Sequence, residues 1–308
     1  MAIKNKLIRP FLRWAGGKQR LTKALIQFIP EQKHYERYIE PFIGGGAIFF
    51  AVQPKQAEIS DINVELINCY KSVARNPQKI SNLLEDYSKK EARTLYYSIR
   101  NQPLEGLTPD ERAARFIFLN KSAFNGIYRE NKNGRFNVPY GPSSNGPAIP
   151  TAERLLQAAS CLRNAKMLVG DFEKFTEKAR KGDFIYFDPP YPPRSKTACF
   201  NHYSKNRFTW EEQVRVADTF LKLSKRGCLV MLSNADKKEI RQLYKDFNIA
   251  RLNAVRWLGS NGDRFGVREI VVTNYDPNRF NKSMPKSNTF QIIKNQIFVK
   301  KTAAMGGD

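Results

Sequence analysis

The sequence predicts an α/β fold in which a mostly parallel β-sheet is covered by helices on both faces. Short apolar runs typical of buried strands recur along the chain, and segments with helical periodicity separate most of them. Continuous apolar strands that alternate with helices are typical of parallel sheets, because both faces of such a sheet are buried. The runs that we assign to strands lie within residues 38–52, 57–63, 166–172, 183–188, 228–235 and 267–275.

A second unit interrupts this alternation. Residues 64–120 have a helical pattern, and a polar stretch rich in Gly, Asn and Pro follows at 125–147. Within it, "NKNG" is a turn signal between two short arms that carry aromatic residues, which predicts a β-hairpin. We therefore expect a discontinuous domain formed by residues 1–63 and 151–277, an inserted, mainly helical domain with a hairpin at 64–150, and a basic C-terminal tail at 278–308.

The charge balance indicates a polyanionic partner. The 308 residues include 52 Lys and Arg against 29 Asp and Glu, which gives a formal net charge of +23. A field of this sign attracts phosphate backbones, and the aromatic residues, 12% of the chain, offer surfaces on which bases can stack. Membrane surfaces are the less favoured alternative, since no apolar run is long enough to span a bilayer and no signal-peptide core is present. We expect a cytoplasmic protein that binds nucleic acid.

Cysteine and histidine are too sparse for several common chemistries. The four cysteines form no CxxC pair, and only His34 and His202 could supply an imidazole. We therefore expect reduced cysteines, no metal site, and no Ser-His-Asp or Cys-His catalytic centre.

Glycines at a strand end predict a site for a nucleoside cofactor. In "PFIGGGA" (41–47) the glycines follow a strand and precede a helix, where the backbone can approach a ligand closely. Asp61 ends the next strand, a position from which a carboxylate can accept hydrogen bonds from ribose hydroxyls. The motif is not GxGxxG, because Phe49 replaces the third glycine. A plain tight turn, and a helix N-cap at Asp61, are the structural alternatives.

The segment "YFDPPY" (186–191) predicts a site for an exocyclic amine. Pro189 holds Asp188 extended, and Pro190 fixes its own φ and donates no hydrogen bond, so the chain leaves the sheet here. The carbonyl of Pro189 can then face a ligand beside the Asp188 carboxylate, and two adjacent acceptors match the two hydrogens of an NH2 group. Tyr191 offers a ring on which a heterocycle can stack. The alternative is an exposed rigid turn. The "SNA" that ends another strand at 233–235 is expected to be structural.

Together, "FLRWAGGK", "EPFIGGGAIFF", "DIN" and "YFDPPY", in this order and interrupted by an insertion with a hairpin, closely resemble Dam-type DNA adenine N6-methyltransferases (D12 class, alpha group). The resemblance covers about residues 8–277. It implies a Rossmann-like catalytic domain, S-adenosylmethionine as methyl donor without a metal, and double-stranded DNA as substrate. It also implies that the inserted domain recognises the target sequence, which is GATC in enzymes with a similar hairpin.

The resemblance assigns roles residue by residue. Asp188, Pro189, Pro190 and Tyr191 match the catalytic motif, whose aspartate also belongs to the cofactor set. The other cofactor-contacting positions are matched by Trp14, Lys18, Phe42, Gly44, Asp61, Asp171 and Phe172. The DNA-contacting positions are matched by Arg13, Phe124, Asn125, Ile127, Arg129 and Pro139. In one departure, "PSSNGP" (142–147) stands where related enzymes often carry basic residues that contact phosphates.

The expected reaction transfers a methyl group to N6 of an adenine that is flipped out of the duplex. Arg129 would read a guanine and Phe124 would wedge into the base stack; the alternatives are a phosphate clamp at Arg129 and a place in the hairpin core for Phe124. For the whole protein, the alternatives are cytosine N4 methylation and a DNA-binding regulator without catalytic activity. We expect a monomer in solution, and a functionally paired restriction endonuclease is a candidate partner.

Overall fold

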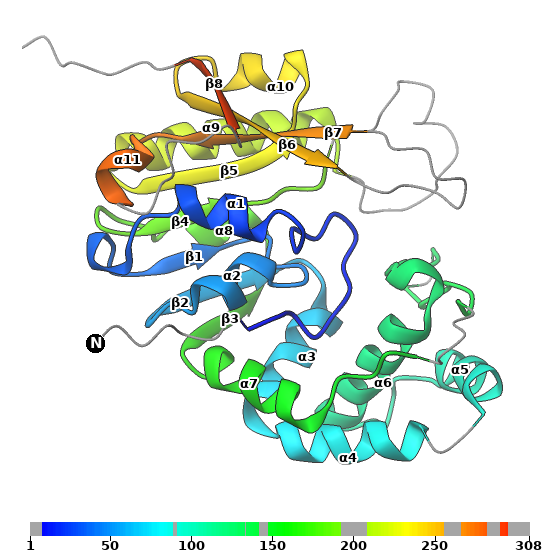
Figure 1. The fold of residues 1–308 in the computed structure, drawn as a ribbon. Helices are drawn as coiled ribbons and strands as arrows, with labels where there is room; N and C mark the ends of the chain where they lie inside the picture. The colour runs from blue at the N-terminus through cyan, green and yellow to red at the C-terminus, as the bar shows by residue number, and fades with distance from the viewer. Residues whose placement is uncertain are drawn as a thin grey trace, which may run out of the picture.

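One mixed β-sheet organises the molecule (Figure 1). The computed structural model describes residues 8–88, 91–132, 134–141, 147–191, 208–255, 266–281 and 290–294. Within these residues, 8 strands follow the order β3-β2-β1-β4-β5-β7-β6-β8 across the sheet. The strands are β1 (Tyr38–Glu40), β2 (Ala57–Asp61), β3 (Ala165–Val169), β4 (Phe184–Phe187), β5 (Leu229–Ala235), β6 (Asn248–Val255), β7 (Gly266–Thr273) and β8 (Phe290–Lys294).

Parallel and antiparallel strands occupy different parts of the sheet. β3, β2, β1, β4 and β5 are parallel neighbours, which brings their carboxyl ends to one edge. β7, β6 and β8 continue the sheet in antiparallel pairs. The predicted α/β fold with a mostly parallel sheet is confirmed, because four of the seven neighbouring strand pairs among the described residues are parallel. The sequence interpretation missed β6, whose apolar run is interrupted by Arg251 and Asn253, and β8, which lies in the expected tail.

Side chains that alternate along the strands bury both faces of the sheet. In β4, Phe184 and Tyr186 point into one apolar core, and Ile185 and Phe187 point into the other. This is why β4 is apolar along its whole length. The first core is covered by α1 (Thr22–Leu25), α2 (Ala47–Val52), α3 (Val64–Arg75) and α7 (Ala152–Leu162), and the second by α8 (Phe172–Thr176), α9 (Trp210–Lys225) and α10 (Lys238–Leu243).

The inserted helices extend the first core. α4 (Pro77–Ser88), α5 (Ala92–Asn101) and α6 (Pro109–Ser122) pack together and against α3 and α7, as expected from the helical pattern of residues 64–120. α6 begins at a capping box, in which Thr108 accepts from the Glu111 N–H and the Glu111 side chain accepts from the Thr108 N–H. Their buried residues belong to the same apolar cluster as Tyr38 and Ile59 of the sheet.

The hairpin follows α6 directly. Its first arm contains the 3-10 turn η3 (Phe124–Gly126), and antiparallel bridges join Ala123 to Tyr140 and Glu130 to Phe136 across the hairpin. The remaining short elements are η1 (Ile26–Phe28), η2 (Gln32–His34) and α11 (Pro277–Phe280). Within the described part of the chain, no helix is both long and apolar enough to cross a membrane.

Candidate active site

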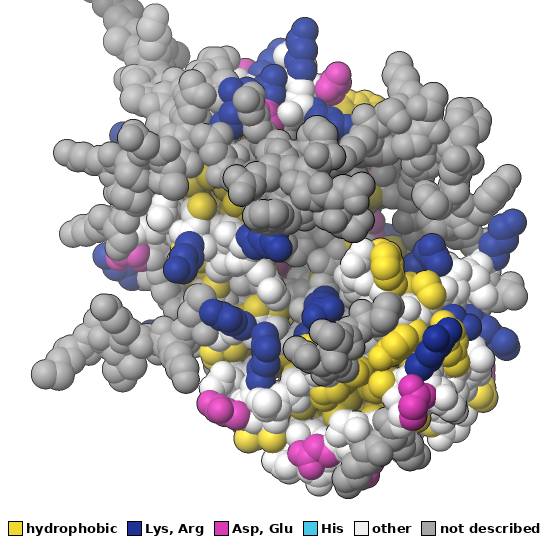
Figure 2. Space-filling model, turned by 45° about the vertical axis from the view of Figure 1, so that its right-hand side comes forward, with side chains coloured by type: hydrophobic (Ala, Val, Ile, Leu, Met, Phe, Trp, Pro, Cys, Tyr) yellow, Lys and Arg dark blue, Asp and Glu magenta, His cyan; other side chains and the backbone are white. Residues whose placement is uncertain are grey.

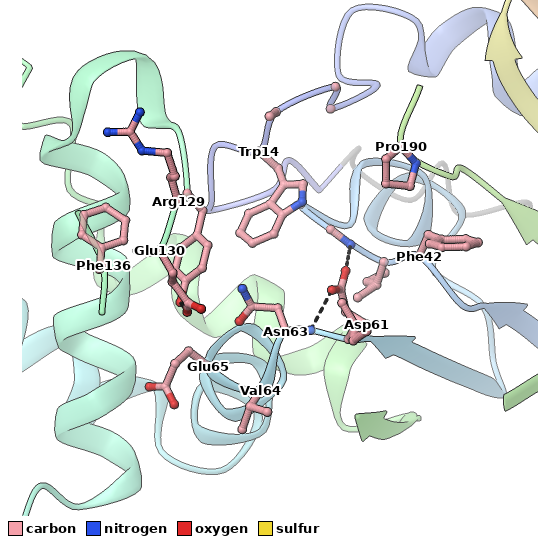
Figure 3. Close-up of a pocket in the computed structure, with 18 of the residues that line it drawn as sticks. Trp14, Phe42, Asp61, Asn63, Val64, Glu65, Arg129, Glu130, Phe136 and Pro190 are labelled. Carbon is pink, nitrogen blue, oxygen red and sulfur yellow. Dashed lines mark hydrogen bonds between the residues drawn. The ribbon is translucent and has the colours of Figure 1, made fainter. Parts of the chain in front are cut away.

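A cleft of about 2150 Å³ lies between the carboxyl ends of the parallel strands and the inserted helices with their hairpin. The ends of β1, β2 and β4 and the turn before α8 line it on the sheet side. Figure 3 shows Trp14 and Asp61 on this side, and Arg129 and Phe136 on the opposite wall. Lys and Arg side chains are spread over the face of the molecule that Figure 2 shows, in keeping with the net charge of +23.

The glycine turn after β1 keeps bare backbone at the cleft. Gly44 has a left-handed φ of 44°. A Cβ at this position would lie 2.7 Å from Cδ1 of Trp14, which is too close for any side chain. Tyr70 fixes the turn by donating its hydroxyl to the Gly44 carbonyl at 2.6 Å. Glycine is therefore required here both by the backbone conformation and by the Trp14 ring.

Asp61 closes the same turn from the next strand. Its Oδ2 accepts from the Gly44 N–H at 3.1 Å and its Oδ1 from the Asn63 N–H at 3.0 Å (Figure 3). Burial raises the pKa of Asp61, opposed by the hydrogen bonds from these two N–H groups. The N-cap of α3 is Asn63, which accepts from the Leu66 N–H at 2.9 Å, so the alternative that Asp61 caps this helix is wrong. Each Asp61 oxygen keeps lone pairs for a further donor.

Asp171 and Phe172 lie beside the cleft after β3. Asp171 caps α8, with Oδ1 accepting from the Glu173 N–H at 3.1 Å, and its Oδ2 pairs with Arg215. The Phe172 ring is buried against Phe42, with centroids 5.2 Å apart, and the Arg215 guanidinium lies 4.5 Å from the Phe172 ring centre. Both residues therefore stabilise the turn through contacts that need no ligand.

Asp188, one residue past β4, is held by two side chains. Nζ of Lys18 lies 2.6 Å from Asp188 Oδ1, and Lys18 is only 2% exposed. Ser233, in β5, donates to the same oxygen at 2.9 Å. Oγ of Ser233 also lies 2.8 Å from the Tyr186 hydroxyl, which must be the donor because Ser233 has one proton. Ser233, the first residue of "SNA", thus contacts the predicted catalytic carboxylate.

The two prolines after Asp188 differ in how their carbonyls are bonded. The Pro190 carbonyl accepts from Nε2 of Gln213, in α9, at 2.7 Å. Among the described residues, none donates a hydrogen bond to the Pro189 carbonyl. The Tyr191 ring centre lies 4.6 Å from Nζ of Lys18. Lys18, matched by resemblance to a cofactor-contacting position, therefore contacts two residues of the predicted catalytic motif.

Glu40, which the sequence interpretation did not single out, ends β1 in the floor of the cleft. It is 2% exposed, and its Oε2 accepts from the Tyr38 hydroxyl at 2.7 Å. Burial raises the pKa of Glu40 well above its ordinary value, opposed by the Tyr38 hydrogen bond and reinforced by the nearby Asp188 charge. Burial of Glu40 beside the catalytic motif therefore favours its protonated form over the carboxylate. The only signal in the sequence was an acid placed directly before the glycine turn.

The first turn of the hairpin exposes large apolar side chains. Phe124 is 50% exposed and Ile127 is 37% exposed. Between them, Asn125 has a left-handed φ of 54°, which turns the chain so that both side chains face solvent. This exposure does not fit the alternative that Phe124 belongs to the hairpin core.

The other predicted DNA-contacting residues lie along the same hairpin or at its base. Nε of Arg129 donates to Oδ1 of Asn137 at 2.8 Å, which orients the guanidinium at the surface. Pro139 is exposed, and its carbonyl accepts from the Phe124 N–H at 3.0 Å. Arg13 packs against Gly126, where a Cβ would come within 2.6 Å of the Arg13 Cβ.

The structure brings all the predicted cofactor and catalytic residues to one cleft, but of the DNA-contacting set only Arg129 lines it. Three residues that contact the predicted catalytic motif or lie beside it were missed, namely Glu40, Ser233 and Gln213. In the expected tail, Phe290–Lys294 pairs with β6 as β8, while 282–289 and 295–308 lie outside the described residues. Of "PSSNGP", only Pro147 lies within them.

Known proteins that are similar to this chain identify its family. The D12 class N6 adenine-specific DNA methyltransferase model matches residues 14–258. The Type II methyltransferase M1.LlaDCHI of Lactococcus lactis subsp. cremoris is 42% identical over 280 residues, 88% of this chain and 98% of the relative. The Type II methyltransferase M.MjaIII of Methanocaldococcus jannaschii is 38% identical over 288 residues, 87% of this chain and 99% of the relative. A DNA adenine methylase of Escherichia coli (strain K12) is 32% identical over 265 residues, 85% of this chain and 92% of the relative. This chain belongs to the D12 class of N6 adenine-specific DNA methyltransferases.

Proposed function

We propose that this enzyme transfers a methyl group from S-adenosylmethionine to N6 of an adenine that is flipped out of double-stranded DNA, within the sequence GATC. The proposal rests on one observation above the others. Asp188 and Pro189, whose carbonyl accepts no hydrogen bond from the described residues, line the same cleft as the Gly44 turn and Asp61. The two groups that we propose accept the hydrogens of an amine therefore line the same cleft as the turn that we propose binds a nucleoside.

The residues at the glycine turn fit S-adenosylmethionine. The bare backbone at Gly44 and the Asp61 carboxylate suit the amino acid and ribose parts of such a ligand. Ile62 and Val64 line the cleft although they are 64% and 56% exposed, and they offer an apolar surface to a heterocycle. The cofactor supplies an electrophilic methyl group on a sulfonium. Asp171 and Phe172 complete the proposed set.

The catalytic motif suits a flipped base. Unstacking a base costs a few kcal/mol, and stacking on Tyr191, worth about 1–3 kcal/mol, offsets much of this cost. Asp188 and the Pro189 carbonyl accept the two hydrogens of N6, so the nitrogen lone pair is directed away from them. As positive charge develops on N6, the Asp188 carboxylate stabilises it, which lowers the barrier selectively. Holding the reactants in line can supply about 7–11 kcal/mol.

GATC recognition is assigned to the hairpin by resemblance. The exposed Phe124 and Ile127 suit insertion beside the bases, and Arg129 suits bidentate contact to a guanine in the major groove. Arg13 and Pro139 lie at the base of the same hairpin. We extend the proposal to a monomeric enzyme in the cytoplasm. A paired restriction endonuclease is the candidate partner, since two relatives are named Type II methyltransferases.

The test is to express the protein in a host that lacks DNA methylation and to map modified bases across its genome. We expect N6-methyladenine in GATC, and none from the Asp188→Ala variant. Methyladenine at another sequence would overturn the GATC assignment. N4-methylcytosine would favour the first alternative, and DNA binding without any modification would favour the regulator.

A further inference from the structure

The predicted catalytic motif is held from both faces of the sheet by consecutive residues of β5. Ser233 donates to Oδ1 of Asp188 on one face. Asn234 points to the other face, because successive strand residues alternate, and its Nδ2 donates to Oε1 of Gln213 at 2.9 Å. Gln213 in turn donates to the Pro190 carbonyl at 2.7 Å.

The side-chain amides of Gln213 and Asn234 are buried, and the hydrogen bonds of each define which end is the oxygen. Gln213 and Asn234 are both 0% exposed. Oδ1 of Asn234 accepts from the Ala235 N–H at 2.8 Å, which fixes which end of that amide faces Gln213. Because Oε1 of Gln213 accepts from Asn234, its Nε2 must face Pro190. Buried amides satisfied in this way adopt one orientation, since any rotation leaves polar groups unpaired.

The bond at Pro190 restrains the dihedral angle that proline leaves free. The rings of Pro189 and Pro190 fix φ at both residues. They do not fix ψ of Pro190, and rotation about ψ would swing the Pro190 carbonyl and the Tyr191 ring together. The hydrogen bond from Gln213 holds this carbonyl in one direction. Tyr191, which lines the cleft, is thereby held in one direction.

We propose that Gln213, oriented by Asn234, is a positioning residue for methyl transfer that sets the direction of the Tyr191 ring. This role rests on the proposed function, in which the Tyr191 ring supports the flipped adenine. Gln213 does not touch the base. Its loss misplaces the ring that does, and a displacement of about 1 Å can lower a rate by about 10²-fold.

The experiment compares Gln213→Met and Gln213→Glu with the wild type. Methionine keeps the length of the side chain without its polar atoms, and glutamate keeps the acceptor for Asn234 but loses the donor to Pro190. Thr219→Val is the matched control: Thr219 lies in the same helix, is 3% exposed, and donates to the Arg215 carbonyl at 2.8 Å, away from the motif. Single-turnover methyl transfer at saturating DNA and labelled S-adenosylmethionine is measured for each.

Both Gln213 variants should lose about 10²-fold in single-turnover rate, with cofactor affinity and KM for DNA unchanged. The signal of 2-aminopurine at the target base should also change, because Tyr191 no longer supports it. Thr219→Val should methylate at the wild-type rate. Wild-type rates in Gln213→Glu, or in a folded Gln213→Met, would overturn the positioning role. A wild-type enzyme that transfers no label to adenine would instead overturn the proposed function, so the two failures are distinguishable.

Discussion

The sheet edge around Asp188 and the hairpin around Arg129 differ in how far their functional groups are bonded within the protein. Asp188 is in contact with the buried Lys18 and with Ser233, and the segment behind it is tied to α9. In the hairpin, Phe124 and Ile127 are 50% and 37% exposed, and Arg129 is bonded only within its own hairpin among the described residues. We therefore infer that folding sets the geometry for methyl transfer, and that DNA binding sets the geometry for recognition.

The largest effect is expected from Asp188→Ala. The rate of methyl transfer should fall by about 10³-fold or more, because the variant lacks the carboxylate that we propose accepts from N6 and stabilises its charge. Cofactor binding, measured by titration calorimetry, should remain measurable. Asp188→Asn is the matched control for shape, and it should be almost as impaired because it lacks the charge. Near-normal methyl transfer by the Asp188→Ala variant would show that the Asp188 carboxylate takes no part in the reaction.

Gly44→Ala tests whether the turn at the sheet edge is rigid. A non-glycine residue with positive φ costs about 1–3 kcal/mol, and its Cβ would collide with Trp14. The free energy of unfolding, from urea denaturation, should fall by about that amount, and cofactor affinity should fall with it. Gly170→Ala is the control, since a Cβ there meets nothing within 4 Å and Gly170 has no positive φ. Equal effects of the two variants would show that the turn tolerates a side chain.

Arg129→Ala probes the hairpin. If Arg129 reads a guanine, discrimination against one base of the site should weaken by about 1–3 kcal/mol, while binding to unrelated DNA changes little. Competition binding with single-base variants of GATC measures this. An equal loss of affinity for all DNA sequences would indicate that Arg129 contacts a phosphate instead.

The smallest effect concerns the buried acid at the sheet edge. The folded-state pKa of Glu40 lies above its unfolded value of about 4.3. At pH values below the unfolded pKa, the contribution of Glu40 to the free energy of unfolding is fully present. It is lost as the pH rises through the folded pKa, because the folded state must then give up a proton that it binds more tightly than the unfolded state does. In Glu40→Gln this loss is absent, so its melting temperature relative to wild type should rise with pH. Parallel curves for the two proteins would show that Glu40 is not protonated in the fold.

The sequence alone predicted the features that depend on short stretches of neighbouring residues. The apolar runs of β1, β2, β4 and β5 and the glycine turn at Gly44 follow from local sequence. Asp61 and Asp188 were expected at the same sheet edge because parallel strands end on one side. β6 was missed, since its apolar residues are interrupted by Arg251 and Asn253 and give a weaker signal than a continuous apolar run.

The partners of Asp188 could not be predicted, because they depend on which strands become neighbours. Ser233 reaches Asp188 only because β5 pairs with β4, and Gln213 reaches Pro190 only through the register of α9 on the sheet. The role of Glu40 could not be predicted without knowledge of its burial, which raises the pKa of its carboxyl group. Lys18 lies near the start of the chain, and nothing local in its sequence indicates that it contacts Asp188 and Tyr191.

The separation of chemistry from recognition is tested most directly by measuring two quantities on the same DNA for Asp188→Ala and Arg129→Ala. The quantities are single-turnover methyl transfer at saturating DNA, and the affinity ratio between GATC and a single-base variant. Asp188→Ala should lose transfer and keep the wild-type ratio, whereas Arg129→Ala should keep transfer and lose most of the ratio. Proportional loss of both quantities in both variants would contradict the account.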